Sequence, residues 1–252
     1  MTATEADHGL WIRRTHTAPD GATRLICLPH AGGSASFYFP ISQRLSNRFD
    51  VVAVQYPGRQ DRRMEPCIDD IGELAAAVFE QLRPLTDRPL ALFGHSMGAT
   101  LGFEVARLLE QEAGVVPTHL FASGRRAPSC HRDETVHLLG DEGLLADVRA
   151  LSGTDARVLG DEEILRMALP AIRGDYKAAE TYRYRPGPPL SCPITAFTGD
   201  DDPKATIAEV KSWAEHTTAA FDLQVFDGGH FFLANHQAAI LRAISEALLP
   251  TT

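Results

Sequence analysis

Short apolar runs alternate with longer amphipathic stretches along the chain. The runs are rich in β-branched and aromatic residues and end near Gly, Pro, Ser or Asn, which predicts buried strands. The expected strands are 24–28 (RLICL), 50–55 (DVVAVQ), 90–93 (LALF), 119–122 (HLFA), 194–198 (ITAFT) and 221–226 (FDLQVF). Apolar residues at helical spacing predict helices over 71–82, 97–110, 207–217 and 237–249. This alternation is typical of an α/β fold, in which helices flank a mostly parallel central sheet.

Two of the expected helices have candidate N-caps. Asp69 or Asp70 precedes the helix at 71–82, and Asn235 precedes the last helix. Carboxylate and amide oxygens at these positions accept hydrogen bonds from unpaired amides of the first helical turn.

The alternation is interrupted between residues 125 and 189. This segment is acidic and helical in pattern, contains no convincing strand, and ends in the proline-rich stretch PGPPL. We expect a helical lid inserted into a single domain that spans residues 1–252, because long insertions near active sites often serve as lids. The alternative is a pair of ordinary surface helices.

Composition narrows the classes of partner. The 252 residues are 44% hydrophobic and 23% charged, as in ordinary globular proteins, and the net charge of −9 disfavours a nucleic-acid partner. No apolar run approaches the roughly 18 residues that a membrane span requires, and the N-terminal residues lack the apolar core of a signal peptide. We therefore expect a cytoplasmic protein without a membrane partner.

The four cysteines are far apart in sequence and form no CxxC pair. This spacing suggests neither a zinc site nor a redox motif, so reduced structural thiols are expected, with no metal.

The strongest chemical signal follows the run LALF. Gly94-His95-Ser96-Met97-Gly98 lies between an expected strand and an expected helix. In this context a Gly-x-Ser-x-Gly pentapeptide predicts a nucleophile elbow, a sharp turn that projects the serine hydroxyl into a cleft. Ser96 is therefore the candidate nucleophile.

A serine nucleophile needs a base, and a carboxylate that orients that base. His230 follows the last expected strand and the loop Asp227-Gly228-Gly229, so it lies at a strand's carboxyl end. Three consecutive aspartates at 200–202 stand between Ser96 and His230, in the chain order serine, acid, histidine. We assign the acid to Asp202, with Asp200 as the second choice.

The loop at 29–34 (PHAGGS), here called the oxyanion loop, is rich in glycine. A tetrahedral oxyanion requires two donors, for which we expect the backbone amides of Ala31 and Met97. A phosphate-binding loop is disfavoured, because no Lys-Ser or Lys-Thr pair closes the motif. Beside this loop, Phe37 and Tyr38 are candidates for lining a substrate channel, with core packing as the alternative.

These motifs resemble those of the type II thioesterases that accompany polyketide synthases and nonribosomal peptide synthetases. The resemblance covers nearly the whole chain and is carried by LPHAGGSASFYFP, QYPGRQDR, FGHSMGA, ETYRYRPGPPLSCPI, TGDDDP and FDGGHFFL. One departure is Asp227, where proline is common in the family before Gly-Gly-His.

The resemblance implies an α/β-hydrolase fold and the hydrolysis of stalled or incorrect acyl groups from the phosphopantetheine arm of acyl or peptidyl carrier proteins. It supports Ser96, Asp202 and His230 as a triad, with the amides of Ala31 and Met97 as the oxyanion hole, and it implies no metal or dissociable cofactor. Five loop arginines are candidates for contacting an acidic carrier, with a role in solubility as the alternative: Arg59, Arg62, Arg63, Arg125 and Arg126.

Three other functions remain open on sequence alone. A carboxylesterase for small esters, or an acyltransferase that passes the acyl group to an alcohol or amine, would use the same residues. A non-catalytic binding protein with this fold is disfavoured, because such a protein has no need for a nucleophile, a base and an acid in this order.

Overall fold

A computed structural model describes residues 9–152 and 162–249. Within these residues, seven strands form one sheet in the order β1-β3-β2-β4-β5-β6-β7. Neighbouring strands pair in parallel, except that β1 runs antiparallel to β3. The strands are β1 (Ile12–Arg13), β2 (Arg24–Leu28), β3 (Asp50–Val54), β4 (Leu90–His95), β5 (Leu120–Ser123), β6 (Ile194–Gly199) and β7 (Phe221–Phe226).

All six expected strands are present, with ends that shift by no more than two residues. Every position of β2 to β6 is buried, which explains why these five strands read as continuous apolar runs, as expected of parallel strands covered on both faces. Sequence analysis missed β1, because two residues are too few to show a period.

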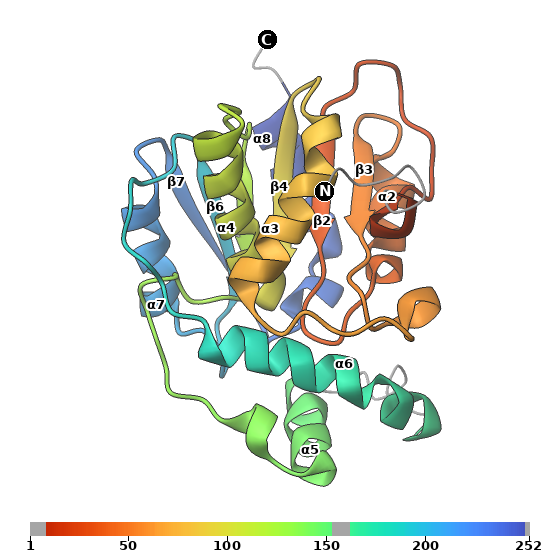
Figure 1. The fold of residues 1–252 in the computed structure, drawn as a ribbon. Helices are drawn as coiled ribbons and strands as arrows, with labels where there is room; N and C mark the ends of the chain where they lie inside the picture. Colours follow the sequence, from red (N-terminus) through yellow and green to blue (C-terminus); the bar gives the residue numbers. More distant parts are fainter. Residues whose placement is uncertain (1–8, 153–161, 250–252) are drawn as a thin grey trace.

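Helices cover both faces of the sheet (Figure 1). One apolar core contains side chains of α3 and α4, and a second core on the opposite face contains side chains of α2 and α8. The helices outside the insertion are α2 (Phe39–Leu45), α3 (Ile71–Leu82), α4 (Met97–Glu112), α7 (Ile207–Lys211) and α8 (Gln237–Leu248). The helix expected over 207–217 is shorter than predicted, because α7 continues as a 3₁₀ helix over Ser212–His216.

One of the two N-cap predictions is confirmed. The Asp70 side chain accepts a hydrogen bond from the Glu73 amide at 3.0 Å, at the start of α3. The prediction for Asn235 is wrong, because α8 begins at Gln237 and its N-cap is His236, which makes no side-chain cap bond.

The segment between β5 and β6 contains α5 (Asp141–Ser152) and α6 (Glu162–Thr181), so its helical character is confirmed. We call residues 125–189 the helical insertion; its residues 153–161 lie outside the described part of the chain. Figure 1 shows α6 lying across one end of the sheet, with α5 beyond it. Its role as a lid stays a prediction.

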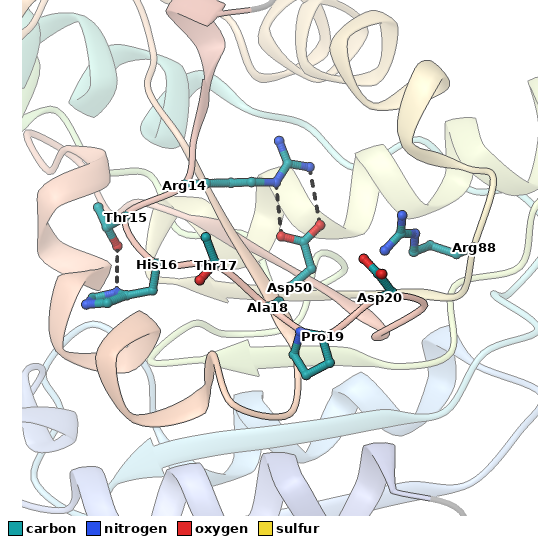
Figure 2. A pocket seen from close by; sticks show the side chains of 9 residues that line it. All are labelled: Arg14, Thr15, His16, Thr17, Ala18, Pro19, Asp20, Asp50 and Arg88. Atoms are coloured by element: carbon teal, nitrogen blue, oxygen red, sulfur yellow. Dashed lines mark hydrogen bonds and ion pairs between the residues drawn. The ribbon is translucent and has the colours of Figure 1, made fainter.

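The opposite end of the sheet is occupied by the N-terminal segment (Figure 2). Arg14 Nε donates to Asp50 Oδ1 at 3.0 Å, at the first residue of β3, and residues 14–20 border a shallow hollow there. This hollow lies at the amino end of β3, whereas Ser96 follows the carboxyl end of β4, which is the usual ligand-binding edge of a parallel sheet.

Of the described helices, none is both long and apolar enough to cross a membrane.

Candidate active site

Ser96 occupies a strained turn between β4 and α4. Its backbone has φ 55° and ψ −121°, a region that non-glycine residues rarely adopt. A Cβ atom at Gly94 would collide with the backbone of Gly98, and one at Gly98 would collide with the carbonyl of Leu28. The two glycines are therefore required by close backbone contacts, and the turn has the geometry of a nucleophile elbow.

The loops after β6 and β7 also approach closely. A Cβ atom at Gly199 would collide with the carbonyl of Gly228, and the Asp201 amide donates to that same carbonyl at 3.1 Å. This contact places the aspartate loop beside the loop that carries His230.

The side chains of Ser96, His230 and Asp202 form one hydrogen-bonded chain. His230 Nε2 lies 3.0 Å from Ser96 Oγ, and His230 Nδ1 lies 2.9 Å from Asp202 Oδ2 and 3.0 Å from Oδ1. His230 and Asp202 are buried, at 3% and 6% exposure. Because a carboxylate only accepts hydrogen bonds, Nδ1 carries the proton, and Nε2 is left to accept the proton of the serine.

The other two aspartates lie outside this chain. The Asp200 carboxylate accepts a hydrogen bond from the Gly228 amide at 2.9 Å, so it stabilises the loop that carries His230. The Asp201 side chain is exposed to solvent. Asp202 also accepts the Lys204 amide at 2.9 Å, which fixes the orientation of its carboxylate.

A cavity of about 360 Å³ opens at Ser96. Both residues expected to supply the oxyanion amides, Ala31 and Met97, line it together with Ser96 and His230. The Met97 amide is the first of the 16-residue helix α4, whose dipole favours negative charge at this end. Both residues therefore border the cavity beside Ser96, and their role as oxyanion donors stays a prediction.

Helix α6 supplies much of the opposite wall of the cavity, through Ala168, Ile172, Tyr176 and Ala179. Sequence analysis did not identify these residues, because nothing local in the chain relates the insertion to Ser96. The signal available was their helical spacing, which predicts one apolar stripe but not its partner.

The two aromatic candidates separate in the structure. Phe37 lines the cavity, whereas Tyr38 does not. Tyr38 is 1% exposed, and its hydroxyl donates to the carbonyl of Leu28 at 2.7 Å. The expected lining role of Tyr38 is thus not supported, because its ring packs against Phe93 in the core.

Two further histidines lie beside His230, and both are held neutral. Burial lowers the pKa of His30 to about 3, and the neighbouring His230 lowers it further. Burial also lowers the pKa of His95 well below its usual value. Neither ring therefore gains a proton near neutral pH, so an imidazolium formed at His230 has no charged histidine beside it.

Four of the five loop arginines considered as carrier contacts are buried. Arg59, Arg62, Arg125 and Arg126 are at most 8% exposed, and only Arg63 is exposed. The four make internal bonds: Arg62, for example, donates to the carbonyl of Gln55 at 2.7 Å. Both interpretations of these four side chains were therefore wrong, because the four are buried and point to partners inside the protein.

The described residues contain no cluster of three or more His, Cys, Asp or Glu side chains that could hold a metal ion. The four cysteines are free thiols.

Comparison with known proteins identifies the family. Residues 23–248 match the family model of the thioesterase domain. The chain belongs to the thioesterase family. This thioesterase is 53% identical to thioesterase PikA5 of Streptomyces venezuelae, over 97% of its own chain and 88% of that protein. It is also 54% identical to a probable cadicidin biosynthesis thioesterase of Streptomyces griseus, over 99% of its chain and 69% of the relative.

A solved structure extends the comparison to three dimensions. The thioesterase superposes on BorB, a type II thioesterase from the borrelidin biosynthetic cluster, with a TM-score of 0.92 and 58% identity. The match covers 95% of this chain and 98% of BorB. These findings confirm the resemblance seen in the sequence: the protein is a type II thioesterase of the α/β-hydrolase superfamily, and it hydrolyses thioesters.

Proposed function

We propose that this thioesterase removes stalled or aberrant acyl groups from the phosphopantetheine arm of acyl or peptidyl carrier domains of a modular synthase, with Ser96 as the nucleophile. The observation that carries the proposal is the hydrogen-bonded chain from Ser96 through His230 to Asp202 at the wall of a largely apolar cavity. The relatives named for cadicidin and borrelidin biosynthesis support a substrate carried on such a synthase.

The reaction proceeds in two halves. Ser96 Oγ attacks the thioester carbonyl while His230 Nε2 takes the serine proton, and the tetrahedral intermediate breaks its C–S bond. His230 returns the proton to the pantetheine sulfur, which leaves as a thiol. A water molecule then attacks the acyl-serine, with His230 again as the base, and releases the free acid.

Asp202 keeps the Nδ1 proton on His230 and stabilises the imidazolium that forms in each half-reaction. The amides of Ala31 and Met97 donate to the oxyanion of both tetrahedral intermediates. In serine hydrolases, losing one such donor costs about a hundredfold to a thousandfold in rate.

The cavity wall formed by α6 gives the acyl group an apolar environment. Val148 and Leu151 of α5 extend this wall, so the insertion determines which acyl groups fit and excludes water from the bound thioester. In this proposal the insertion is the lid of the active site.

The test is the release of free acid from one acyl group presented in two ways: as a thioester on a carrier protein and as an oxygen ester of a simple alcohol. The proposal predicts that the carrier thioester is hydrolysed much faster than the oxygen ester and that the acyl group appears as the free acid. Preference for the oxygen ester would favour a carboxylesterase, and an acyl group recovered on an added alcohol or amine would favour an acyltransferase; either result contradicts the proposal.

A further inference from the structure

A carboxylate of the insertion reaches the oxyanion loop. Asp175, on α6, accepts the backbone amide of Gly32 at 2.7 Å through Oδ2. Its other oxygen accepts a hydrogen bond from Arg59 Nη2 at 2.8 Å. One carboxylate thus connects three segments that are far apart in sequence: the loop after β2, the loop after β3, and α6.

Gly32 lies at the decisive position of a tight turn. The Gly33 amide donates to the carbonyl of His30 at 2.9 Å, and Gly32 has φ +74°. Together these features define a type II turn with Ala31 and Gly32 at its centre. Glycine also adopts negative φ readily, so the loop sequence alone leaves the central peptide free to flip. The bond from the Gly32 amide to Asp175 selects the observed orientation.

Helix α6 packs directly against this turn. A Cβ atom at Gly32 would lie 2.7 Å from Ile172 Cγ1, one helical turn before Asp175. The absence of a side chain at Gly32 therefore lets the helix approach closely enough for the carboxylate to reach the backbone amide.

The pair formed by Asp175 and Arg59 is deeply buried. Their side chains are 1% and 6% exposed, and Arg59 Nε and Nη1 have no hydrogen-bond partner among the described residues. Burial raises the pKa of Asp175, and Arg59 opposes that rise. Desolvation offsets most of the attraction in such a pair, so net stability is a poor explanation for it. Its geometry points to a role in positioning.

We infer that Asp175 is a positioning residue for the thioesterase reaction: from the insertion, it fixes the turn that carries the Ala31 amide, so that the oxyanion hole is formed only while α6 is docked. Arg59 orients the Asp175 carboxylate and balances its charge. This inference rests on the proposed function, in which the Ala31 amide binds the oxyanion.

The test compares two charge-neutral double variants, since Asp175→Asn alone would leave Arg59 unpaired in the interior. Arg59→Gln/Asp175→Asn keeps an oxygen acceptor for the Gly32 amide, and Arg59→Gln/Asp175→Ala removes it. Two quantities are measured: kcat and KM on an acyl-pantetheine thioester, and the affinity for an alkyl boronic acid, which forms a tetrahedral adduct with Ser96.

The double variant with Asp175→Ala is expected to show a kcat about tenfold or more below that of the double variant with Asp175→Asn, and boronate affinity lower by a similar factor, since an oxyanion donor acts mainly in the transition state. KM should change little. Equal kcat and equal boronate affinity in the two double variants would overturn the inference, because a purely structural role would lower thermal stability without weakening tetrahedral binding selectively.

Two controls separate the possible failures. Lys177→Met removes the exposed ion pair of α6 with Asp69, away from Gly32, so it should leave boronate affinity unchanged. Ser96→Ala should abolish turnover. If Ser96→Ala stays active, the proposed function itself fails; if Ser96→Ala is inactive and the two double variants behave alike, only the role of Asp175 fails.

Discussion

Backbone contacts determine where Ser96, Asp202 and His230 lie at the carboxyl ends of the strands, whereas the helical insertion is connected to the rest of the chain through side chains, several of them charged. The elbow and the two loops behind the triad meet at glycines that allow backbone-to-backbone contact. In contrast, ion pairs join the insertion to the rest of the chain: Lys204 Nζ lies 3.3 Å from Asp147 Oδ1 of α5, and Lys177 Nζ of α6 lies 2.6 Å from Asp69 Oδ2.

The two regions also differ in the size of their apolar cores. Among its described residues, the insertion has a small core of its own, made of five buried residues: Leu144, Leu145, Leu169, Ile172 and Tyr176. The sheet is buried between two much larger cores. Because its own core is smaller, and because the exposed pair of Lys177 with Asp69 contributes at most about 1 kcal/mol, we expect the insertion to open at a lower free energy than the sheet. The proposed function accordingly places the chemistry at the sheet and the selection of the acyl group at the insertion.

The largest expected effect tests whether Ser96 is the nucleophile. Ser96→Ala should lower turnover by about a millionfold, as the loss of a triad nucleophile does in other serine hydrolases. The measurement is acid release from an acyl thioester under single-turnover conditions. Ser245→Ala, on α8 and remote from the cavity, is the matched control and should retain wild-type activity. Comparable rates for the two variants would remove Ser96 from the reaction.

The next effect separates the aspartates. Asp202→Asn should lower kcat by about 10⁴-fold, because the amide no longer holds the proton on His230 Nδ1. Asp200→Asn keeps an oxygen acceptor for the Gly228 amide, so its kcat should remain within about threefold of the wild type. The pH profile of kcat for each variant checks the assignment, and the opposite ranking of the two variants would contradict it.

A smaller effect is expected from the insertion. Ala168→Phe should reduce kcat/KM for a long acyl thioester about tenfold to a hundredfold by filling the α6 wall, while a short acyl thioester is affected little. Ala76→Phe, at an exposed position of α3, is the control for adding an aromatic ring to a helix surface. An equal loss for both chain lengths would show that the α6 wall does not select the acyl group.

The smallest effect concerns the stability of the sheet at low pH. Burial lowers the pKa of His119 to about 4, below its unfolded value of 6.5. Between these pH values the unfolded chain binds a proton at His119 that the folded chain does not bind. The contribution of neutral His119 to the free energy of unfolding is therefore fully present above pH 6.5 and is lost as the pH falls toward 4. Between pH 7 and pH 4.5, the wild type should lose roughly 1–2 kcal/mol more than His119→Gln.

Urea unfolding at the two pH values measures this difference. The carboxylates contribute equally to both proteins, so they cancel in the comparison. If both proteins lose the same free energy on acidification, His119 does not carry the effect.

The same division explains how far sequence analysis reaches. Buried parallel strands leave continuous apolar runs, and the elbow needs glycines at fixed offsets, so the sheet and the position of Ser96 are visible in short segments of sequence. Contacts between segments that are far apart in the sequence are not visible in this way. The Asp175 carboxylate falls beside an apolar helical stripe that includes Ile172 and Tyr176, which is a sign of a buried charge, but the pattern does not identify Gly32 as its partner.

The loop arginines also show that local sequence does not predict tertiary contacts. Charge predicts exposure in general, yet Arg59 and Arg125 are buried, because tertiary contacts supply acceptors that no local pattern reveals. Tyr38 is a further example of a tertiary contact that the local pattern does not reveal. Its neighbour Phe37 lines the cavity, but the Tyr38 hydroxyl donates to the carbonyl of Leu28 in the core.

The central claim is that Ser96 accepts the acyl group from a carrier thioester. It is tested most directly by replacing Ser96 with 2,3-diaminopropionic acid, whose β-amine attacks the thioester and retains the acyl group as a stable amide. After incubation with an acyl-carrier protein, the account predicts a mass gain of one acyl group per chain, located at residue 96, together with release of the free carrier thiol. Absence of the adduct, under conditions in which the wild type hydrolyses the same acyl-carrier protein, would contradict the account.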